Sequence, residues 1–145
     1  VVNRFLVQAV ASIPLTVYGR GGQVRGYLNL RDTIQCIALA VANPAKQSEL
    51  RILNQFTETF SVNQLAHHVA RVGAKLGLNV EIQHVDNPRK EMEEHHYNPA
   101  HHALLELGLK PHFMTDDVLA SMLENVIKHR DAIVVSRILP RVRWK

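Results

Sequence analysis

The sequence predicts an α/β fold of mixed helices and short strands, and two observations carry that prediction. Apolar side chains recur three and four positions apart over several stretches of the 145 residues, which is the periodicity of helices. Short apolar or alternating runs lie between these stretches and are typical of strands. Because helices alternate with strands, the class is α/β or α+β, and we take α/β as the prediction. The length is that of one domain with a sizeable core, and no linker, internal repeat or low-complexity segment divides it.

The composition is that of a globular chain rather than a disordered one, with 46% hydrophobic and 21% charged residues. The net charge is +4 with His neutral, but the basic residues are scattered except in the tail 137–145. Such an excess suits small anionic ligands, and we expect no nucleic-acid partner. No apolar run reaches the roughly 18 residues of a membrane span, and no signal peptide is visible. Because the first residue is Val1, we expect the chain to begin partway through a protein.

In the first third of the chain, residues 3–12 are predicted to form a helix that Pro14 ends. Two apolar runs, 15–18 and 24–30, flank the turn Gly19-Arg20-Gly21-Gly22, and this arrangement predicts a hairpin. Asp32 or Thr33 is expected to cap a helix over 33–42. That helix is apolar almost all round, so we expect it to be buried, with Cys36 as a structural thiol.

The rest of the chain starts with a predicted strand over 50–56. Ser61-Val-Asn-Gln64 is a capping box, and the helix after it is expected to end at Gly77 and to face inward through Leu65, Val69, Val72 and Leu76. A strand is predicted over 80–85, and a helix over 99–107 closed by Gly108. Thr115 is expected to cap a last helix to His129, with core-facing Leu119, Met122, Leu123, Val126 and Ile127. The segment 134–145 receives no assignment.

The turn region is also the first candidate site. A hairpin would bring Tyr18 and Arg25 together, and a flat aromatic beside a guanidinium suits a ligand with a ring and a phosphate. A purely structural hairpin, with a surface Arg and a half-buried Tyr, is equally compatible with this spacing.

The segment Leu15-Thr-Val-Tyr-Gly-x-Gly-x-Gln-x-Arg resembles the nucleotide-binding segment of extended short-chain dehydrogenases/reductases that act on nucleotide sugars. Most of that superfamily has Asp after the Arg, whereas this chain has Gly26. Taken together, the glycine after Arg25 and the stretches 51–58 and 87–98 closely resemble the corresponding segments of one family, the UDP-sulfoquinovose synthases. The resemblance covers essentially the whole chain and implies that residues 1–145 are the C-terminal, nucleotide-sugar-binding part of a larger NAD-dependent enzyme.

The region 88–102 is rich in Arg, Lys, Glu and His. A metal site, a solvated charged loop and a ligand-binding loop are the three interpretations. No His-x3-His or His-Glu-x-x-His spacing occurs, which weighs against a metal. The resemblance favours the ligand loop and implies that Arg89 faces the diphosphate and Glu91 the nucleoside, although Glu93 or Glu94 could take the acidic role. It also implies substrate contacts from Asn3, Arg4, Thr16, Tyr18 and Arg25.

Two motifs of such enzymes are absent from the sequence. No Gly-x-Gly-x-x-Gly follows a predicted strand, and no Tyr is followed by Lys at the Tyr-x-x-x-Lys spacing. The resemblance places both in a Rossmann half, N-terminal to this chain, which binds NAD. We therefore expect no catalytic, cofactor-binding or metal-binding residues here, and we expect the chain alone to be inactive.

The activity that the resemblance implies is the formation of UDP-sulfoquinovose, the head-group donor of sulfolipid, from UDP-glucose and sulfite. In that reaction NAD oxidises the sugar at C4, water is lost, sulfite adds at C6, and the reduced cofactor restores C4. The alternatives are another NAD-dependent nucleotide-sugar epimerase or dehydratase, or a non-catalytic nucleotide-binding module. The resemblance further implies a homodimer for the whole enzyme and a cytoplasmic location, or the plastid stroma in a photosynthetic eukaryote.

Overall fold

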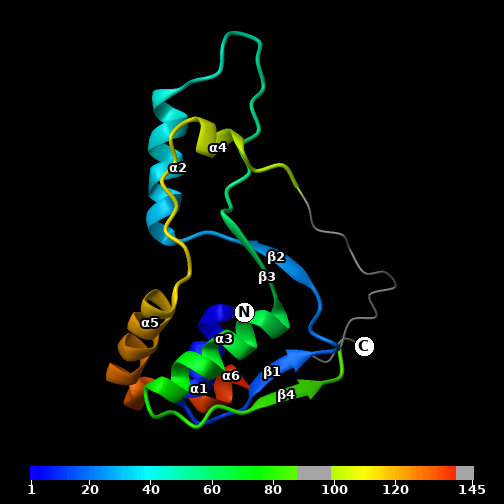
Figure 1. Ribbon diagram of the computed structural model, residues 1–145, viewed down its shortest axis with the longest axis vertical. Helices are drawn as coiled ribbons and strands as arrows, with labels where there is room; N and C mark the ends of the chain where they lie inside the picture. Colours follow the sequence, from blue (N-terminus) through cyan, green and yellow to red (C-terminus); the bar gives the residue numbers. More distant parts are fainter. Residues whose placement is uncertain (88–98, 140–145) are drawn as a thin grey trace. The chain divides into compact units, whose positions relative to one another are not determined.

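The computed structural model describes residues 1–87 and 99–139 (Figure 1). The chain divides into two compact units, whereas its length predicts one domain. Unit 1 comprises Val1–Gln23, Phe60–His95 and Thr115–Lys145, and unit 2 comprises Val24–Thr59 and His96–Met114. Each unit is assembled from segments that are distant in sequence, so chain length alone does not reveal the division.

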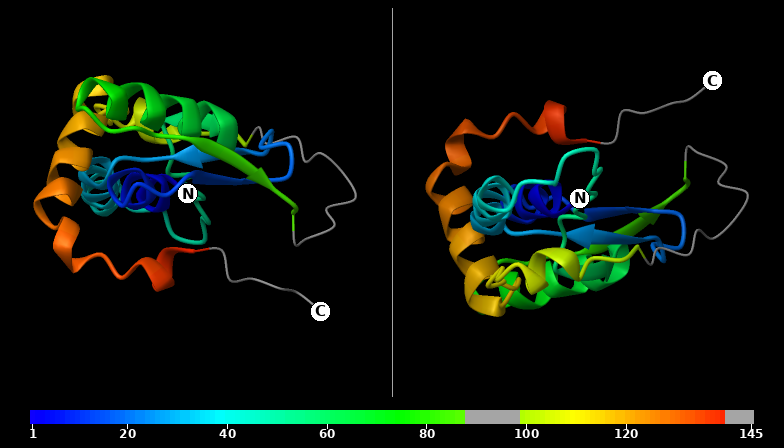
Figure 2. Two further views of the ribbon diagram at one scale, coloured as in Figure 1. Left: turned by 90° about the horizontal axis from the view of Figure 1, so that it is seen from below. Right: turned by 90° about the horizontal axis from the view of Figure 1, so that it is seen from above.

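The main elements of unit 1 are a group of long helices and a pair of strands. The helices are α1 (Val2–Val10), α3 (Val62–Lys75) and α5 (Asp116–Lys128), and all three pack against one another. The strands β1 (Leu15–Tyr18) and β4 (Ile82–Val85) are parallel, with Leu15 opposite Ile82 and Tyr18 opposite Val85. Figure 2 shows α3, in green, running alongside β4. The core between these elements contains Phe5, Leu6, Val10, Leu15, Val17, Leu65, Val69, Val72, Leu119 and Leu123.

The local signals at the helix ends of unit 1 are confirmed. Ser61 Oγ accepts from the Gln64 N–H, and Gln64 Oε1 accepts from the Ser61 N–H, which completes the predicted capping box of α3. Thr115 caps α5, because its hydroxyl oxygen accepts from the Val118 N–H at 3.3 Å. Gly77 follows α3 in the left-handed region with φ 78°. Ile127 was expected to face the core and is 37% exposed.

The predicted hairpin is wrong. Leu15–Tyr18 and β2 (Val24–Tyr27) are both strands, but β1 pairs with β4 and β2 pairs with β3 (Glu58–Ser61). The glycines do supply positive φ angles, 61° at Gly19 and 69° at Gly21. A tight Gly turn indicates a change of chain direction, but it does not identify the strand that pairs with β1. That strand is β4, which is distant in sequence, and the residue before it, Glu81, accepts from the Leu15 N–H through its carbonyl.

Unit 2 contains the helix α2 (Leu30–Ala42), which differs from the prediction in its cap and in its burial. Asn29 is the cap, because its side chain accepts from the Arg31 N–H, and Asp32 lies in the first turn as a fully buried residue. Only Asp32 and Cys36 of α2 are buried. Four apolar side chains of this helix, Leu30, Ile34, Ile37 and Val41, are exposed, so the expectation of a helix buried all round is wrong.

The remaining segments of unit 2 are mostly irregular. Residues 50–56 do not form the predicted strand, and Leu50 and Ile52 are exposed. The Arg51 and Asn54 side chains donate to the Asn43 and Ala100 carbonyls instead, so hydrogen bonds other than a strand ladder hold this segment. The predicted helix over 99–107 is reduced to α4 (Ala103–Glu106), followed by Gly108 with φ 99°. A small core joins the buried residues Cys36, Leu104 and Leu109, with Leu28, Leu39 and Leu53 packed against it.

The end of unit 1 carries a 3-10 turn, η1 (Arg130–Ala132), and a short helix, α6 (Val135–Ile138). Arg130 donates to the hydroxyl of Ser12, just after α1. Within residues 1–87 and 99–139, no helix has the length and apolar character needed to cross a membrane.

Candidate functional site

Helix α1 and strand β1 hold together three of the predicted site residues. Arg4 donates from Nη2 to the Thr16 carbonyl at 2.7 Å. The guanidinium carbon of Arg4 also lies 5.3 Å from the ring centroid of Tyr18, which is within cation–π range. The Arg4 Nε is buried and has no hydrogen-bond partner among the described residues. Arg4, Thr16 and Tyr18 therefore form one cluster, with an unused donor on Arg4.

Sequence reasoning missed Gln8, which completes this cluster. Gln8 is fully buried, and its Nε2 donates to Thr16 Oγ1 at 2.6 Å while its Oε1 accepts from the Thr16 N–H at 3.2 Å. The available signal was a polar residue within an apolar helix, one turn after Arg4. Thr16 is only 4% exposed, so its hydroxyl points into unit 1.

The two edges of β1 have different partners. Leu15 donates its N–H to the Glu81 carbonyl and Gly19 donates to the Val85 carbonyl, both at 2.8 Å. Because backbone groups alternate along a strand, Thr16 and Tyr18 direct their N–H and C=O groups away from β4. At Thr16 those groups are occupied by Gln8 and Arg4. The N–H and C=O groups of Tyr18 point in the same direction, beside the start of the glycine loop (residues 19–22).

The glycine loop is fixed within unit 1 by Asn63 and His84. Asn63 donates its backbone N–H to the Gly21 carbonyl at 3.0 Å and its Nδ2 to the Arg20 carbonyl at 2.7 Å. His84 Nδ1 lies 2.8 Å from the Gly19 carbonyl oxygen. A Cβ atom at Gly21 would lie 2.6 Å from Cγ1 of Val17, so a side chain there has no room. The loop that follows Tyr18 is therefore held in one shape.

The other predicted site residues lie elsewhere. Asn3 is exposed on the first turn of α1. Arg25 belongs to unit 2, where it is exposed on β2 and donates to the carbonyl of Val24 at 2.7 Å. Arg89 and Glu91 lie outside the described residues, as do Glu93 and Glu94. The roles predicted for all of these residues stay predictions.

Gly26, the residue that departs from the superfamily pattern, has a packing role in unit 2. A Cβ atom at Gly26 would lie 2.7 Å from Cγ of Phe56. The Phe56 ring in turn lies against the His101 ring, with 4.3 Å between their centroids. A residue with a side chain would displace Phe56, which gives a physical reason for glycine after Arg25.

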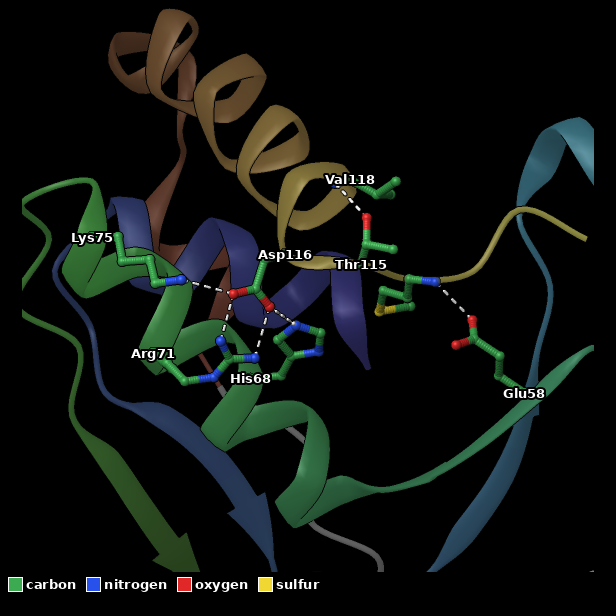
Figure 3. Close-up of polar contacts among 8 residues, drawn as sticks. Glu58, His68, Arg71, Lys75, Thr115, Asp116 and Val118 are labelled. Atoms are coloured by element: carbon green, nitrogen blue, oxygen red, sulfur yellow. Dashed lines mark hydrogen bonds and ion pairs between the residues drawn. The ribbon is translucent and has the colours of Figure 1, made fainter.

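A second charged cluster joins α5 to α3 (Figure 3). The carboxylate of Asp116 accepts from Arg71, from Lys75 at 2.8 Å and from His68 at 3.0 Å. The Arg71 guanidinium, followed by Lys75 and His68, holds the pKa of Asp116 well below its usual range. Arg71, Lys75 and His68 on α3 all contact this one carboxylate on α5, so the cluster links the two helices.

Unit 2 contains a buried carboxylate beside a buried thiol. Asp32 accepts from the His112 N–H at 2.7 Å, and its other oxygen lies 2.6 Å from His112 Nδ1. Burial, and then the Asp32 carboxylate, raise the pKa of the Cys36 thiol. Cys36 is free and buried, so the predicted structural role of this cysteine agrees with its surroundings. A raised pKa disfavours the thiolate that a nucleophile requires.

The residues that the structure describes contain neither a cluster of metal ligands nor the characteristic motif of NAD-binding folds. No group of three or more His, Cys, Asp or Glu side chains within those residues could hold a metal ion. The glycine loop after β1 leads to another strand, β2, and the helix after β3 starts at a capping box without glycine. A strand, glycine loop and helix in that order, which NAD-binding folds use, is therefore not present in the described residues.

No family model matches the chain. Two curated relatives match nearly all of it. The chain is 56% identical over 143 residues to the chloroplastic UDP-sulfoquinovose synthase of Spinacia oleracea, covering 99% of this chain and 30% of that protein. It is 43% identical to the UDP-sulfoquinovose synthase of Sulfolobus acidocaldarius, covering all of this chain and 37% of that protein. The chain thus spans about a third of the length of these relatives.

A solved structure shows the fold. The UDP-glucose 4-epimerase of Thermus thermophilus, determined as a complex with NAD, superposes with a TM-score of 0.65 at 20% identity. The match covers 86% of this chain and 39% of the epimerase. The mixed α/β class and the resemblance seen in the sequence are both confirmed. The chain is a relative of the UDP-sulfoquinovose synthases and has the fold of part of a nucleotide-sugar epimerase.

Proposed function

We propose that this chain is the C-terminal, substrate-binding part of a UDP-sulfoquinovose synthase, which makes UDP-sulfoquinovose from UDP-glucose and sulfite for sulfolipid. The observation that carries the proposal is the 56% identity over 99% of the chain to a protein of that name. The Sulfolobus acidocaldarius relative bears the same name, although it is only 43% identical.

The geometry of β1 supports binding of a nucleotide by this part. The outward edge of β1 is occupied at Thr16 by Arg4 and Gln8, and the main-chain groups of Tyr18 point the same way. A strand-edge amide and carbonyl beside a flat ring are suited to a planar base with its own donors and acceptors. Arg4 adds a guanidinium with one unused donor near that ring.

The proposed share of this part in catalysis is binding energy and orientation. In the proposal, Tyr18 contacts the nucleoside, and Arg4 and Asn3 lie near the diphosphate, which Arg25 and Arg89 also contact. Fixed remote contacts lower a barrier because they hold the reacting sugar carbon in position. In the proposal, the NAD that supplies hydride chemistry is bound by another part of the complete protein, because the described residues lack the strand, glycine loop and helix that hold a dinucleotide. A homodimer and a cytoplasmic or plastid-stroma location belong to the same proposal.

The direct test is an assay of the complete protein with UDP-glucose, sulfite and NAD, with the products identified by mass. We expect UDP-sulfoquinovose to form only when sulfite is present. Conversion of UDP-glucose to another UDP-sugar without sulfite would point instead to an epimerase or dehydratase. Binding of UDP without turnover would point to a non-catalytic module.

A further inference from the structure

Gln8 is an amide in an otherwise apolar face of α1. The other buried residues of this helix are Val2, Phe5, Leu6, Ala9 and Val10. A buried amide is destabilising unless its hydrogen bonds are made. Both bonds of Gln8 go to one residue, since Nε2 donates to Thr16 Oγ1 and Oε1 accepts from the Thr16 N–H. An apolar residue would fill this face without that requirement, so the amide serves the position of Thr16.

Thr16 is held at every one of its polar positions. Its N–H and its hydroxyl oxygen bond to Gln8, and its carbonyl accepts from Arg4. Arg4 and Gln8 are one turn apart and therefore share a face of α1. This pair occupies the edge of β1 that β4 does not use. The register of α1 against β1 is thus fixed by specific hydrogen bonds as well as by apolar packing.

Tyr18 lies two residues farther along the same strand edge. Its ring is under the Arg4 guanidinium, and the loop that follows it is held by Asn63. A displacement of Thr16 would carry Tyr18 with it, because an extended chain of two residues transmits a shift with little loss. A shifted ring and strand edge would meet the nucleotide base in a poorer position, so part of the binding free energy would be lost.

We propose that Gln8 is a positioning residue for nucleotide recognition, which sets the place of Tyr18 by holding Thr16 at its N–H and its hydroxyl. This inference rests on the proposed function, since it concerns the same nucleotide. Gln8 does not contact the ligand; it acts through Thr16. Its contribution therefore appears in the affinity for the nucleotide and not in the affinity for NAD.

The test compares Gln8→Met with the unchanged complete protein. Methionine has a similar length and removes both hydrogen bonds. We expect the dissociation constant for UDP, measured by calorimetry, to rise roughly tenfold, which corresponds to about 1.4 kcal/mol of binding free energy lost when Tyr18 is displaced. The dissociation constant for NAD is expected to stay the same. A melting curve recorded for each protein gives the accompanying loss of stability.

Leu123→Ala is the matched control for stability. Leu123 is a fully buried core residue of α5, so its truncation lowers the melting temperature through a cavity. We expect this variant to bind UDP normally at a temperature where it is folded. Equal weakening of UDP in Gln8→Met and Leu123→Ala would overturn the inference, because both effects would then reflect general loosening.

A double substitution further separates the effect of the position of Thr16 on UDP affinity from the effect on the stability of the protein. In Gln8→Met/Thr16→Val no buried hydroxyl is left unpaired, so the melting temperature should recover partly relative to Gln8→Met. The UDP affinity should stay low, because the Thr16 N–H is still not held. If Gln8→Met does not fold, Thr16→Val is the deciding variant. It keeps the bond from the Thr16 N–H to Gln8 and loses the one to the hydroxyl, so we expect a smaller weakening of UDP binding, about two- to threefold. Normal UDP affinity in the folded Gln8→Met protein would overturn the inference, whereas failure of the unchanged protein to bind UDP would overturn the proposed function instead.

Discussion

Gly26 lies so close to Phe56 that a Cβ atom on the glycine would be 2.7 Å from Cγ and 2.9 Å from Cβ of the phenylalanine. The first prediction follows from this contact. Gly26→Ala should lower the stability of the protein by roughly 1–3 kcal/mol through overpacking, and Gly26→Asp should lower it more. Gly22→Ala is the matched control, since nothing lies within 4 Å of a Cβ there. Chemical denaturation of the three variants measures the effect, and equal stability of Gly26→Ala and Gly22→Ala would contradict it.

Asp116 gives a pH-dependent prediction. Its folded pKa is held below its usual range by Arg71, Lys75 and His68. A lowered folded pKa stabilises the fold above the unfolded pKa of about 3.9 and loses that contribution as the pH falls below it. Asp116→Asn should therefore melt at a lower temperature than the unchanged protein at pH 7, and the difference should shrink toward pH 3.

The matched control for Asp116 is Asp117→Asn. Asp117 is exposed at the neighbouring position in the first turn of α5 and shares its favourable interaction with the helix dipole. Its substitution removes the same charge without breaking the cluster with Arg71, so the melting temperature should fall less. Equal shifts in the two variants would show that the cluster adds nothing beyond the dipole.

Cys36 should be chemically inert in the folded protein. Burial and the nearby Asp32 carboxylate raise the pKa of the thiol, and the side chain has no exposed surface. A disulfide reagent at pH 8 should react slowly with the native protein and at once in denaturant. Cys36→Ala should leave the activity of the complete enzyme unchanged. Rapid labelling of the native thiol would contradict the structural role.

Arg25 should act through phosphate recognition. Arg25→Lys keeps the positive charge and loses the planar pair of donors, so it should still weaken UDP-glucose binding to the complete enzyme. Arg20→Lys is the control, because Arg20 is an exposed loop residue whose carbonyl, not its side chain, is bound by Asn63. If Arg25→Lys and Arg25→Ala both bind UDP-glucose normally, Arg25 has only a structural role.

Arg89 and Glu91 provide the last prediction. A hydrogen bond to a charged group is worth roughly 1.5–3 kcal/mol, so Arg89→Ala should weaken UDP and UDP-glucose about ten- to a hundredfold. Glu91→Gln should weaken both less, because an amide still accepts a hydrogen bond from a ribose hydroxyl. Neither change should alter the NAD affinity. Normal UDP titrations for both variants would favour a solvated charged loop at this place.

Features that depend on near neighbours in the chain could be predicted from the residue types. The capping box of Ser61 and Gln64 and the Thr115 cap involve bonds across three residues, so the residue types alone identify them. The left-handed Gly77 is likewise a local property of the backbone. The relationship to the UDP-sulfoquinovose synthases was also readable, because it rests on the order of several short motifs along the chain.

Strand pairing and the burial of polar groups depend on contacts between residues far apart in sequence, so they became known from the structure. The free energy of a strand pair depends on both strands. The partner of β1 begins at Ile82, so the Gly-rich turn next to Tyr18 could not identify that partner. The exposure of Ile34 and Ile37 on α2 likewise depends on what packs around the helix and not on its composition. In the sequence, Gln8 is only a polar residue in an apolar helix. The structure shows that both of its hydrogen bonds go to Thr16, and these partners explain why an amide is buried there.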